Sequence, residues 1–207
     1  GGDKPAPFLD LPKEENPALG FRGARFLLGN LHLLQAQVRA IGYASRQGPI
    51  HLMYPMIADV EQFIKLKEIV TATLAETDPG TILHGVMFEI PAACLQAREL
   101  FALADFGSIG TNDLFQYLYA VDRNNERVAA DFTPDKPVFW SVIATVVRAA
   151  EEAGKPLSVC GEIAGWPEYI LKLRDSGVRT VSVSARMISR VRKALLTKPS
   201  ESTPGAG

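Results

Sequence analysis

Residues 82–91, Ile-Leu-His-Gly-Val-Met-Phe-Glu-Ile-Pro, decide the fold class of this chain. The stretch is a nearly continuous apolar run that ends in a carboxylate, Glu89, and in a proline suited to the first turn of a helix. An apolar run of this length is typical of a strand buried on both faces, as in a parallel sheet covered by helices. We therefore predict that residues 82–89 form an internal strand that leads directly into a helix.

The same alternation of short apolar strand and helix continues on both sides of this stretch. Further strands are predicted at residues 50–56, 106–109, 157–160 and 178–183, and further helices at residues 31–48, 60–77, 114–119, 137–153, 167–175 and 186–196. Asn30 and Asp59 are the candidate N-caps of the first two helices, and Gly154 is expected just past the end of the helix at 137–153.

About five strand–helix units can be counted, against the eight of a closed (β/α) barrel. Two architectures remain open: a doubly wound open sheet, and a barrel of the TIM type that is incomplete in this chain. The glycine-rich dinucleotide fingerprint does not follow any predicted strand, which favours the barrel. We expect one partial barrel over residues 1–196, with residues 1–19 as an irregular surface segment and residues 197–207 as a disordered tail.

Composition narrows the function classes. The chain has 207 residues, 47% hydrophobic and 22% charged, with a net charge of −1, so it lacks the basic footprint of a nucleic-acid binder. Neither a signal peptide nor an apolar run long enough for a membrane helix is present in the sequence. Cys94 and Cys160 are isolated from each other and form no CxxC motif. We expect a cytoplasmic protein with no membrane insertion and no nucleic-acid partner.

Polar residues gather where the predicted strands end, which in a barrel is the face that carries chemistry. Glu89 follows one strand, Asn112 and Asp113 follow the next, and Cys160 ends a later one. Two carboxylates without a histidine-rich set suit Mg²⁺ or Mn²⁺, which keep water and take further oxygens from an anionic substrate. The alternative is that Glu89 and Asp113 only cap the following helices or complement their dipoles.

The remaining candidates are a thiol and three arginines. Cys160 can be a small buried hydrophobe or, as a protonated thiol at neutral pH, a general acid. Arg22, Arg25 and Arg123 can be solvated surface residues or bidentate donors to phosphate and carboxylate groups. The histidines share no metal-like spacing and are interpreted as structural; His51, on a strand, is the only one retained as a candidate.

Several motifs together resemble the phosphoenolpyruvate-utilising enzymes. The one at residues 108–123, Ser-Ile-Gly-Thr-Asn-Asp-Leu followed by Gln116 and Ala-Val-Asp-Arg, is similar to a signature of that family. Other matching segments are residues 1–4, 14–22, 85–92 and 159–165. Residues 122–129 are most similar to the enzyme I group of the bacterial sugar phosphotransferase system, the phosphoenolpyruvate-protein phosphotransferases.

This resemblance implies a phosphoenolpyruvate-binding barrel with particular residue roles. Glu89 and Asp113 are then Mg²⁺ ligands, Arg22, Asn112 and Arg123 bind substrate, and Cys160 is the acid that protonates the enolate carbon. The implied partners are phosphoenolpyruvate and pyruvate, a separate domain bearing the phosphorylated histidine, a small phosphocarrier protein and a second copy of the chain. The family also has earlier strands, so we expect this sequence to be a fragment.

Two rival functions remain. A pyruvate phosphate dikinase or phosphoenolpyruvate synthase keeps the barrel but makes phosphoenolpyruvate, and a linked nucleotide-binding domain in the full protein would favour it. A barrel remnant without turnover would instead serve as a binding or dimerisation module.

Overall fold

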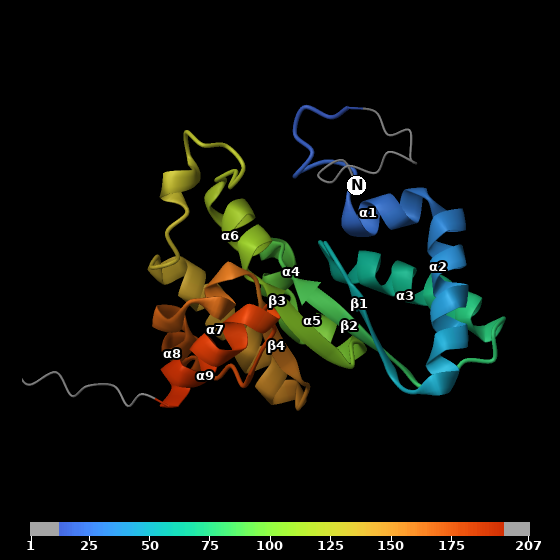
Figure 1. Ribbon diagram of the computed structural model, residues 1–207. Helices are drawn as coiled ribbons and strands as arrows, with labels where there is room; N and C mark the ends of the chain where they lie inside the picture. The colour runs from blue at the N-terminus through green and yellow to red at the C-terminus, as the bar shows by residue number, and fades with distance from the viewer. Residues whose placement is uncertain (1–12, 197–207) are drawn as a thin grey trace, which may run out of the picture.

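The computed structural model describes residues 13–196, which alternate between strands and helices as the sequence predicts (Figure 1). The strands are β1 (Ile50–Tyr54), β2 (Ile82–Phe88), β3 (Phe106–Gly110), β4 (Leu157–Cys160) and β5 (Thr180–Val181). The helices are α1 (Gly23–Gly29), α2 (Leu31–Ala44), α3 (Val60–Ala75), α4 (Pro91–Leu95), α5 (Ala97–Leu103), α6 (Thr111–Tyr119), α7 (Pro137–Ala153), α8 (Pro167–Asp175) and α9 (Ile188–Leu196). The predicted tail at residues 197–207 lies outside the described residues.

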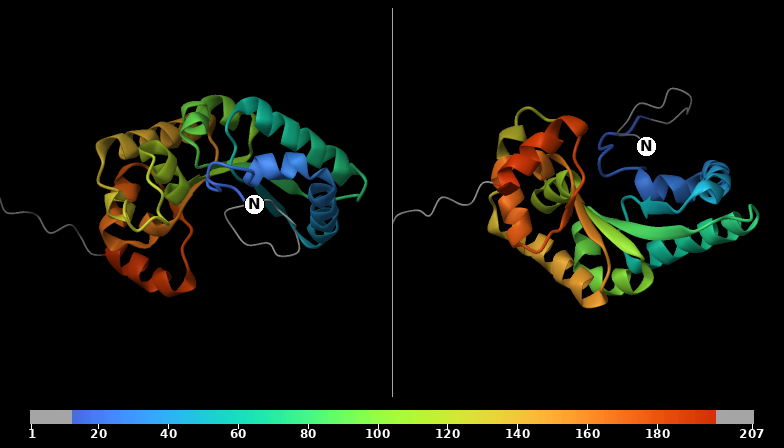
Figure 2. Two further views of the ribbon diagram at one scale, coloured as in Figure 1. Left: turned by 90° about the horizontal axis from the view of Figure 1, so that it is seen from above. Right: turned by 60° about the horizontal axis from the view of Figure 1, so that its bottom comes forward.

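The strands form one parallel sheet in which each strand pairs with its neighbours in the sequence, in the order β1-β2-β3-β4-β5. A doubly wound sheet reverses its strand order at a switch point, and this sheet does not. Figure 2 shows the sheet as an open arc with α3, α5 and α7 along its outer side. The structure therefore confirms the incomplete barrel and excludes the doubly wound alternative.

The two faces of the strands carry different residues, and this division places the site. Val86 and Phe88 of β2 are fully buried against the outer helices, together with Ile109 of β3. Gly107 leaves room for this layer, because a Cβ there would lie 2.8 Å from Phe88 and 2.9 Å from Phe101. The alternate residues lie on the inner face, where Met87 of β2 pairs with Ser108 of β3, and Gly110 of β3 pairs with Cys160 of β4. Glu89 follows β2 directly.

Several boundaries differ from the prediction for local reasons. β1 ends at Tyr54 instead of residue 56, because Pro55 follows and Met56 adopts a left-handed conformation with φ of 55°. β5 has two residues instead of six, and it pairs only with β4 among the described strands. α6 begins at Thr111 instead of Leu114, so Asn112 and Asp113 lie in its first turn.

The two predicted caps differ in their bonding. Asp59 caps α3 as expected, since its side chain accepts a hydrogen bond from Gln62 N at 2.7 Å. Asn30 does stand at the start of α2, but its side chain donates to Phe26 O at 2.9 Å and so closes α1 instead. The helix α1 itself was not predicted.

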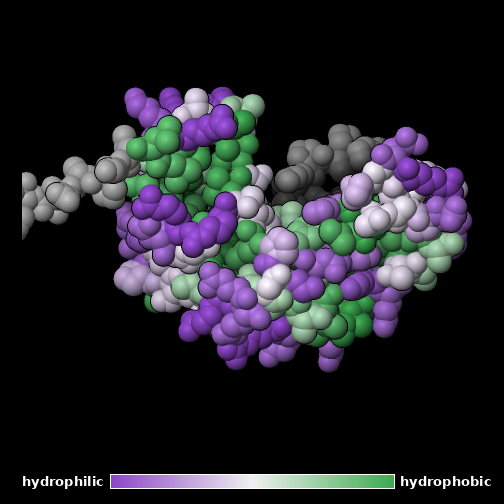
Figure 3. Space-filling view, turned by 90° about the horizontal axis from the view of Figure 1, so that it is seen from below, coloured by the Kyte–Doolittle hydropathy of each residue, from purple (hydrophilic) through white to green (hydrophobic). Residues whose placement is uncertain are grey.

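Hydrophobic residues also reach the surface of the open arc. On α9, Ile188, Leu195 and Leu196 are exposed. Figure 3 shows that the underside is hollowed and that apolar residues gather on one side of the hollow. Within residues 13–196, every helix is too short or too polar to cross a bilayer.

Candidate active site

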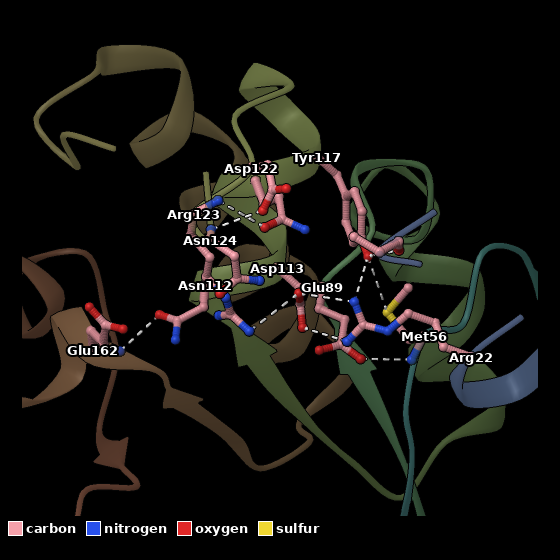
Figure 4. Close-up of polar contacts among 12 residues, drawn as sticks. Arg22, Met56, Glu89, Asn112, Asp113, Tyr117, Asp122, Arg123, Asn124 and Glu162 are labelled. Atoms are coloured by element: carbon pink, nitrogen blue, oxygen red, sulfur yellow. Dashed lines mark hydrogen bonds and ion pairs between the residues drawn. The ribbon is translucent and has the colours of Figure 1, made fainter. Parts of the chain in front are cut away.

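Two carboxylates converge where β2 and β3 end. Glu89 follows β2, is only 7% exposed, and accepts a hydrogen bond from Met56 N at 2.7 Å through Oε1. Asp113 lies in the first turn of α6, and Figure 4 shows the two carboxyl groups side by side. Burial raises the pKa of Glu89 to about 7, and the neighbouring Asp113 charge also raises it, whereas the Met56 N–H and Arg22 oppose the rise.

Arg22 bridges this pair to the N-terminal side of the structure. Its Nη1 and Nη2 atoms lie 3.4 and 3.3 Å from the two carboxylate oxygens of Asp113. The Arg22 side chain is 10% exposed, so the ion pair is shielded from water. Arg123 approaches the same carboxylate, with Nη2 3.9 Å from Asp113 Oδ1, from a more exposed position.

Asn112 links the site to β4 instead of pointing at the carboxylates. Its Oδ1 atom accepts a hydrogen bond from Glu162 N at 3.0 Å. Gly161 makes this contact possible: its φ is 102°, and a Cβ there would lie 2.2 Å from Thr111 Oγ1 and 2.9 Å from Asn112 Oδ1. The turn after Cys160 is thereby held against the start of α6.

Cys160 lies at the end of β4, opposite Gly110 of β3. Its Sγ atom is 3.9 Å from Met87 Sδ and 3.6 Å from Ile109 O. Burial raises the pKa of the thiol, and the charges of Glu89 and Asp113 raise it further against the effect of Ser108. The thiol therefore keeps its proton at neutral pH, as a general acid must.

A cavity of about 660 Å³ opens beside the Arg22–Asp113 pair. It lies between residues 15–19 and the C-terminal half of α6 with the following residues 120–124. Arg22, Asp113 and Arg123 line it, whereas Glu89, Asn112 and Cys160 lie outside this lining. The two arginines thus face the cavity together with the carboxylates of Glu15, Asp113 and Asp122, so the lining carries charges of both signs.

The candidate residues Arg22, Glu89, Asn112, Asp113, Arg123 and Cys160 all lie at this one edge of the sheet. Arg25 does not join them, since it is exposed and donates to Leu19 O at 3.2 Å. His51 is near the opposite end of β1, where its ring lies 5.0 Å from that of Phe106. Asp113 lies in the first turn of α6, where a carboxylate also complements the helix dipole, as the alternative interpretation predicted. Glu89 is not a helix cap, because Ile90 is the N-cap of α4.

Three contacts within the candidate site were not expected from the sequence. Tyr117 accepts a hydrogen bond from Arg22 Nη1 at 2.9 Å, Met56 N holds Glu89, and Gln116 Oε1 accepts from Arg123 N at 3.3 Å. The spacing of Tyr117, one helical turn after Asp113, could have indicated the first. The sequence carried no signal for Met56, because its contribution comes from the backbone.

The donor set fits a hard divalent cation. Glu89 and Asp113 offer carboxylate oxygens, and a bound cation would offset the burial that chiefly raises the pKa of Glu89 as well as the smaller repulsion from Asp113. Among residues 13–196, His, Cys, Asp and Glu form no cluster of three that could enclose a metal. Such an ion would need further oxygens from water or from a ligand.

Comparisons with known proteins agree with this arrangement. Residues 1–199 match the family model described as PEP-utilising enzyme, PEP-binding domain. The chain is 41% identical to the multiphosphoryl transfer protein of Xanthomonas campestris and 40% identical to the phosphoenolpyruvate-protein phosphotransferase of Haemophilus influenzae, each over 94% of this chain. It spans 23% and 35% of these two relatives.

The fold is also found among solved structures. A citrate lyase from Burkholderia xenovorans superposes with a TM-score of 0.61 at 17% identity, over 80% of this chain and 54% of that one. A likeness at this identity concerns the fold alone, whereas the family model covers nearly the whole chain. The chain therefore belongs to the PEP-utilising enzymes, and it corresponds to their PEP-binding domain.

Proposed function

We propose that this chain is the phosphoenolpyruvate-binding catalytic domain of a phosphoenolpyruvate-protein phosphotransferase. The phosphoryl group would pass from phosphoenolpyruvate to a histidine on a separate domain, and pyruvate would be released. The convergence of Glu89 and Asp113 with Arg22 at the ends of β2 and β3 carries this proposal. The names of the relatives at about 40% identity support the same reaction.

Acidic and basic residues of the site have different roles. Glu89 and Asp113 would hold Mg²⁺ or Mn²⁺, which would supply positive charge to stabilise the negative enolate oxygen. Arg22 and Arg123 face the cavity and bind the phosphate and carboxylate groups of the substrate. Asn112, tied to the turn after Cys160, contacts the substrate from the first turn of α6.

Cys160 completes the reaction as the proton donor. Cleavage of the P–O bond of phosphoenolpyruvate leaves its electron pair on the enolate, and the thiol proton passes to the enolate carbon to give pyruvate. The raised pKa of Cys160 supports this role, because the group must be protonated before it can donate. The resulting thiolate regains its proton from solvent.

The rest of the proposal concerns the whole protein. The histidine passes the phosphoryl group to a small phosphocarrier protein of a sugar or related phosphotransferase system, and the chain pairs as a homodimer. A cytoplasmic location suits the free thiols of Cys94 and Cys160, which a reducing compartment preserves.

Two variants of the full-length protein test the proposed roles of Asp113 and Cys160, because they should affect different steps. Asp113→Ala removes a cation ligand, so we expect loss of Mn²⁺ binding measured by electron paramagnetic resonance. Cys160→Ala removes only the proton donor, so phosphoenolpyruvate should bind nearly normally while pyruvate release slows by about two orders of magnitude. Asp175→Ala, at an exposed carboxylate on α8, is the matched control.

Retained Mn²⁺ affinity in Asp113→Ala would remove Asp113 from the ligands. Equal losses of binding and turnover in Cys160→Ala would exclude a role confined to protonation.

A further inference from the structure

Tyr117 occupies a central place beside the ion pair, although the proposed reaction gives it no role. Its hydroxyl accepts a hydrogen bond from Arg22 Nη1 at 2.9 Å and donates one to the carbonyl oxygen of Ala18 (Figure 4). It is half-buried, lines the cavity, and stands one helical turn after Asp113. Burial raises the pKa of the hydroxyl, which keeps the proton that the bond to Ala18 requires.

The geometry around Arg22 shows what the hydroxyl controls. Nη1 is shared between Tyr117 at 2.9 Å and Asp113 at 3.4 Å, so its shorter contact is with the hydroxyl. Arg22 stands at the N-cap of α1, a helix of only seven residues, and it reaches α6 through a long side chain. Because the guanidinium group is planar and rigid, a hydrogen bond that fixes Nη1 also fixes the direction of Nη2.

We propose that Tyr117 is a positioning residue that holds the Arg22 guanidinium between Asp113 and the cavity, where the phosphate group of the substrate binds. The inference rests on the proposed function, since it requires a phosphate-bearing ligand on the arginine side of the cavity. In this arrangement Arg22 neutralises Asp113 before the ligand arrives and is already oriented when the phosphate enters.

A purely structural role for Tyr117 makes a different prediction. The hydroxyl also ties residue 18 to α6, so its loss could simply loosen the whole edge of the sheet. General loosening would weaken metal binding and phosphate binding alike. Loss of the hydroxyl alters only the orientation of the Arg22 guanidinium, so phosphate binding should weaken. Glu89 keeps its bond from Met56 N and Asp113 keeps its contact with Arg22 Nη2, so cation binding should change little.

The experiment compares Tyr117→Phe with the wild type in the full-length protein. We expect 2-phosphoglycolate, a phosphate ester of a small carboxylic acid, to bind about tenfold more weakly at saturating Mg²⁺ by calorimetry, as for loss of a hydrogen bond to a charged group. Mn²⁺ alone should bind within about twofold of the wild type. Tyr119→Phe on the same helix is the control, since the Tyr119 ring packs on Phe115 and beneath Lys136.

A double-mutant cycle with Arg22→Gln separates action through Arg22 from any other effect. In the Arg22→Gln background, Tyr117→Phe should change 2-phosphoglycolate affinity by less than about twofold. A tenfold loss in that background, or parallel losses of Mn²⁺ and 2-phosphoglycolate in the single variant, would overturn the proposal. A wild type that binds neither probe would instead refute the proposed function itself, and the positioning role with it.

Discussion

At the scale of single residues, Glu89 is a carboxyl group whose ionised form is destabilised by its surroundings. Its carboxyl group is almost fully buried and lies beside a second carboxylate, and one backbone N–H donates to it. Burial and repulsion both favour the protonated form, which places the pKa at about 7. Proteins accept such a cost where the charged form is needed for binding or catalysis.

Glu89→Gln should therefore stabilise the cation-free protein at alkaline pH. Because the folded-state pKa of Glu89 is raised from 4.5 to about 7, its contribution to stability is present below pH 4.5 and is lost as the pH rises through 7. Relative to the wild type, we expect a gain in the free energy of unfolding that is small at pH 5, below about 1 kcal/mol, and that reaches about 3 kcal/mol at pH 8.

Urea unfolding in the presence of EDTA measures this difference. Glu99→Gln, at an exposed position on α5, controls for the change of side chain and should show no such dependence on pH. The same Glu89→Gln variant should lose Mn²⁺ affinity, so its gain in stability accompanies a loss of function. An equal gain at both pH values would contradict the assigned pKa.

At the scale of elements, the outer layer depends on the small size of one strand residue. β2 and β3 pair with Val86 opposite Gly107 and Phe88 opposite Ile109. The rings of Phe88 and Phe101, 4.9 Å apart, occupy the space over Gly107. The strand ends that carry Glu89 and Gly110 are therefore held in register by a layer of side chains on the other face of the sheet.

Gly107→Ala should destabilise the fold by about 1–3 kcal/mol, because the added methyl group would overlap both rings and force them to shift. Chemical denaturation measures the change, and near-ultraviolet circular dichroism reports the environment of the aromatic side chains. Gly48→Ala is the matched control, since a Cβ at Gly48 meets nothing within 4 Å. Similar losses in both variants would show that the Phe88–Phe101 pair does not limit this position.

At the scale of the whole molecule, the site is built from segments far apart in the sequence. Arg22 and Asp113 are separated by 91 positions, Asn112 and Glu162 by 50, and Met56 and Glu89 by 33. These contacts involve Arg22, which precedes α1, and residues that follow the ends of four strands, β1 to β4. A ligand that bridges them should stabilise the folded state of the entire arc, because the site does not exist in the unfolded chain.

Mg²⁺ and 2-phosphoglycolate together should raise the melting temperature of the full-length protein by more than the sum of their separate effects. Each ligand relieves charge that opposes the other, and a ligand at 100 times its dissociation constant adds about 2.7 kcal/mol. Differential scanning calorimetry measures the shifts, and EDTA should reverse the joint effect. Strictly additive shifts would show that the two ligands bind independently.

The sequence by itself determined the architecture and the edge of the sheet that carries the site. Alternating apolar strands and helices predicted a parallel sheet, and the polar residues that follow those strands had to meet because parallel strands end at one edge. That reasoning located Glu89, Asp113 and Cys160 and offered three arginines, of which the motifs assigned Arg22 and Arg123 to the substrate. It needed only local periodicity and the direction of the chain.

Only the tertiary structure decided how these side chains engage one another. It selected Arg22 over Arg25 as the partner of Asp113, turned Asn112 toward the loop after Cys160, and added the Tyr117 hydroxyl. It also set the N–H of Met56 against Glu89 through a left-handed backbone conformation. Side-chain direction and backbone conformation at a turn depend on packing between segments distant in sequence, and local patterns do not encode that packing.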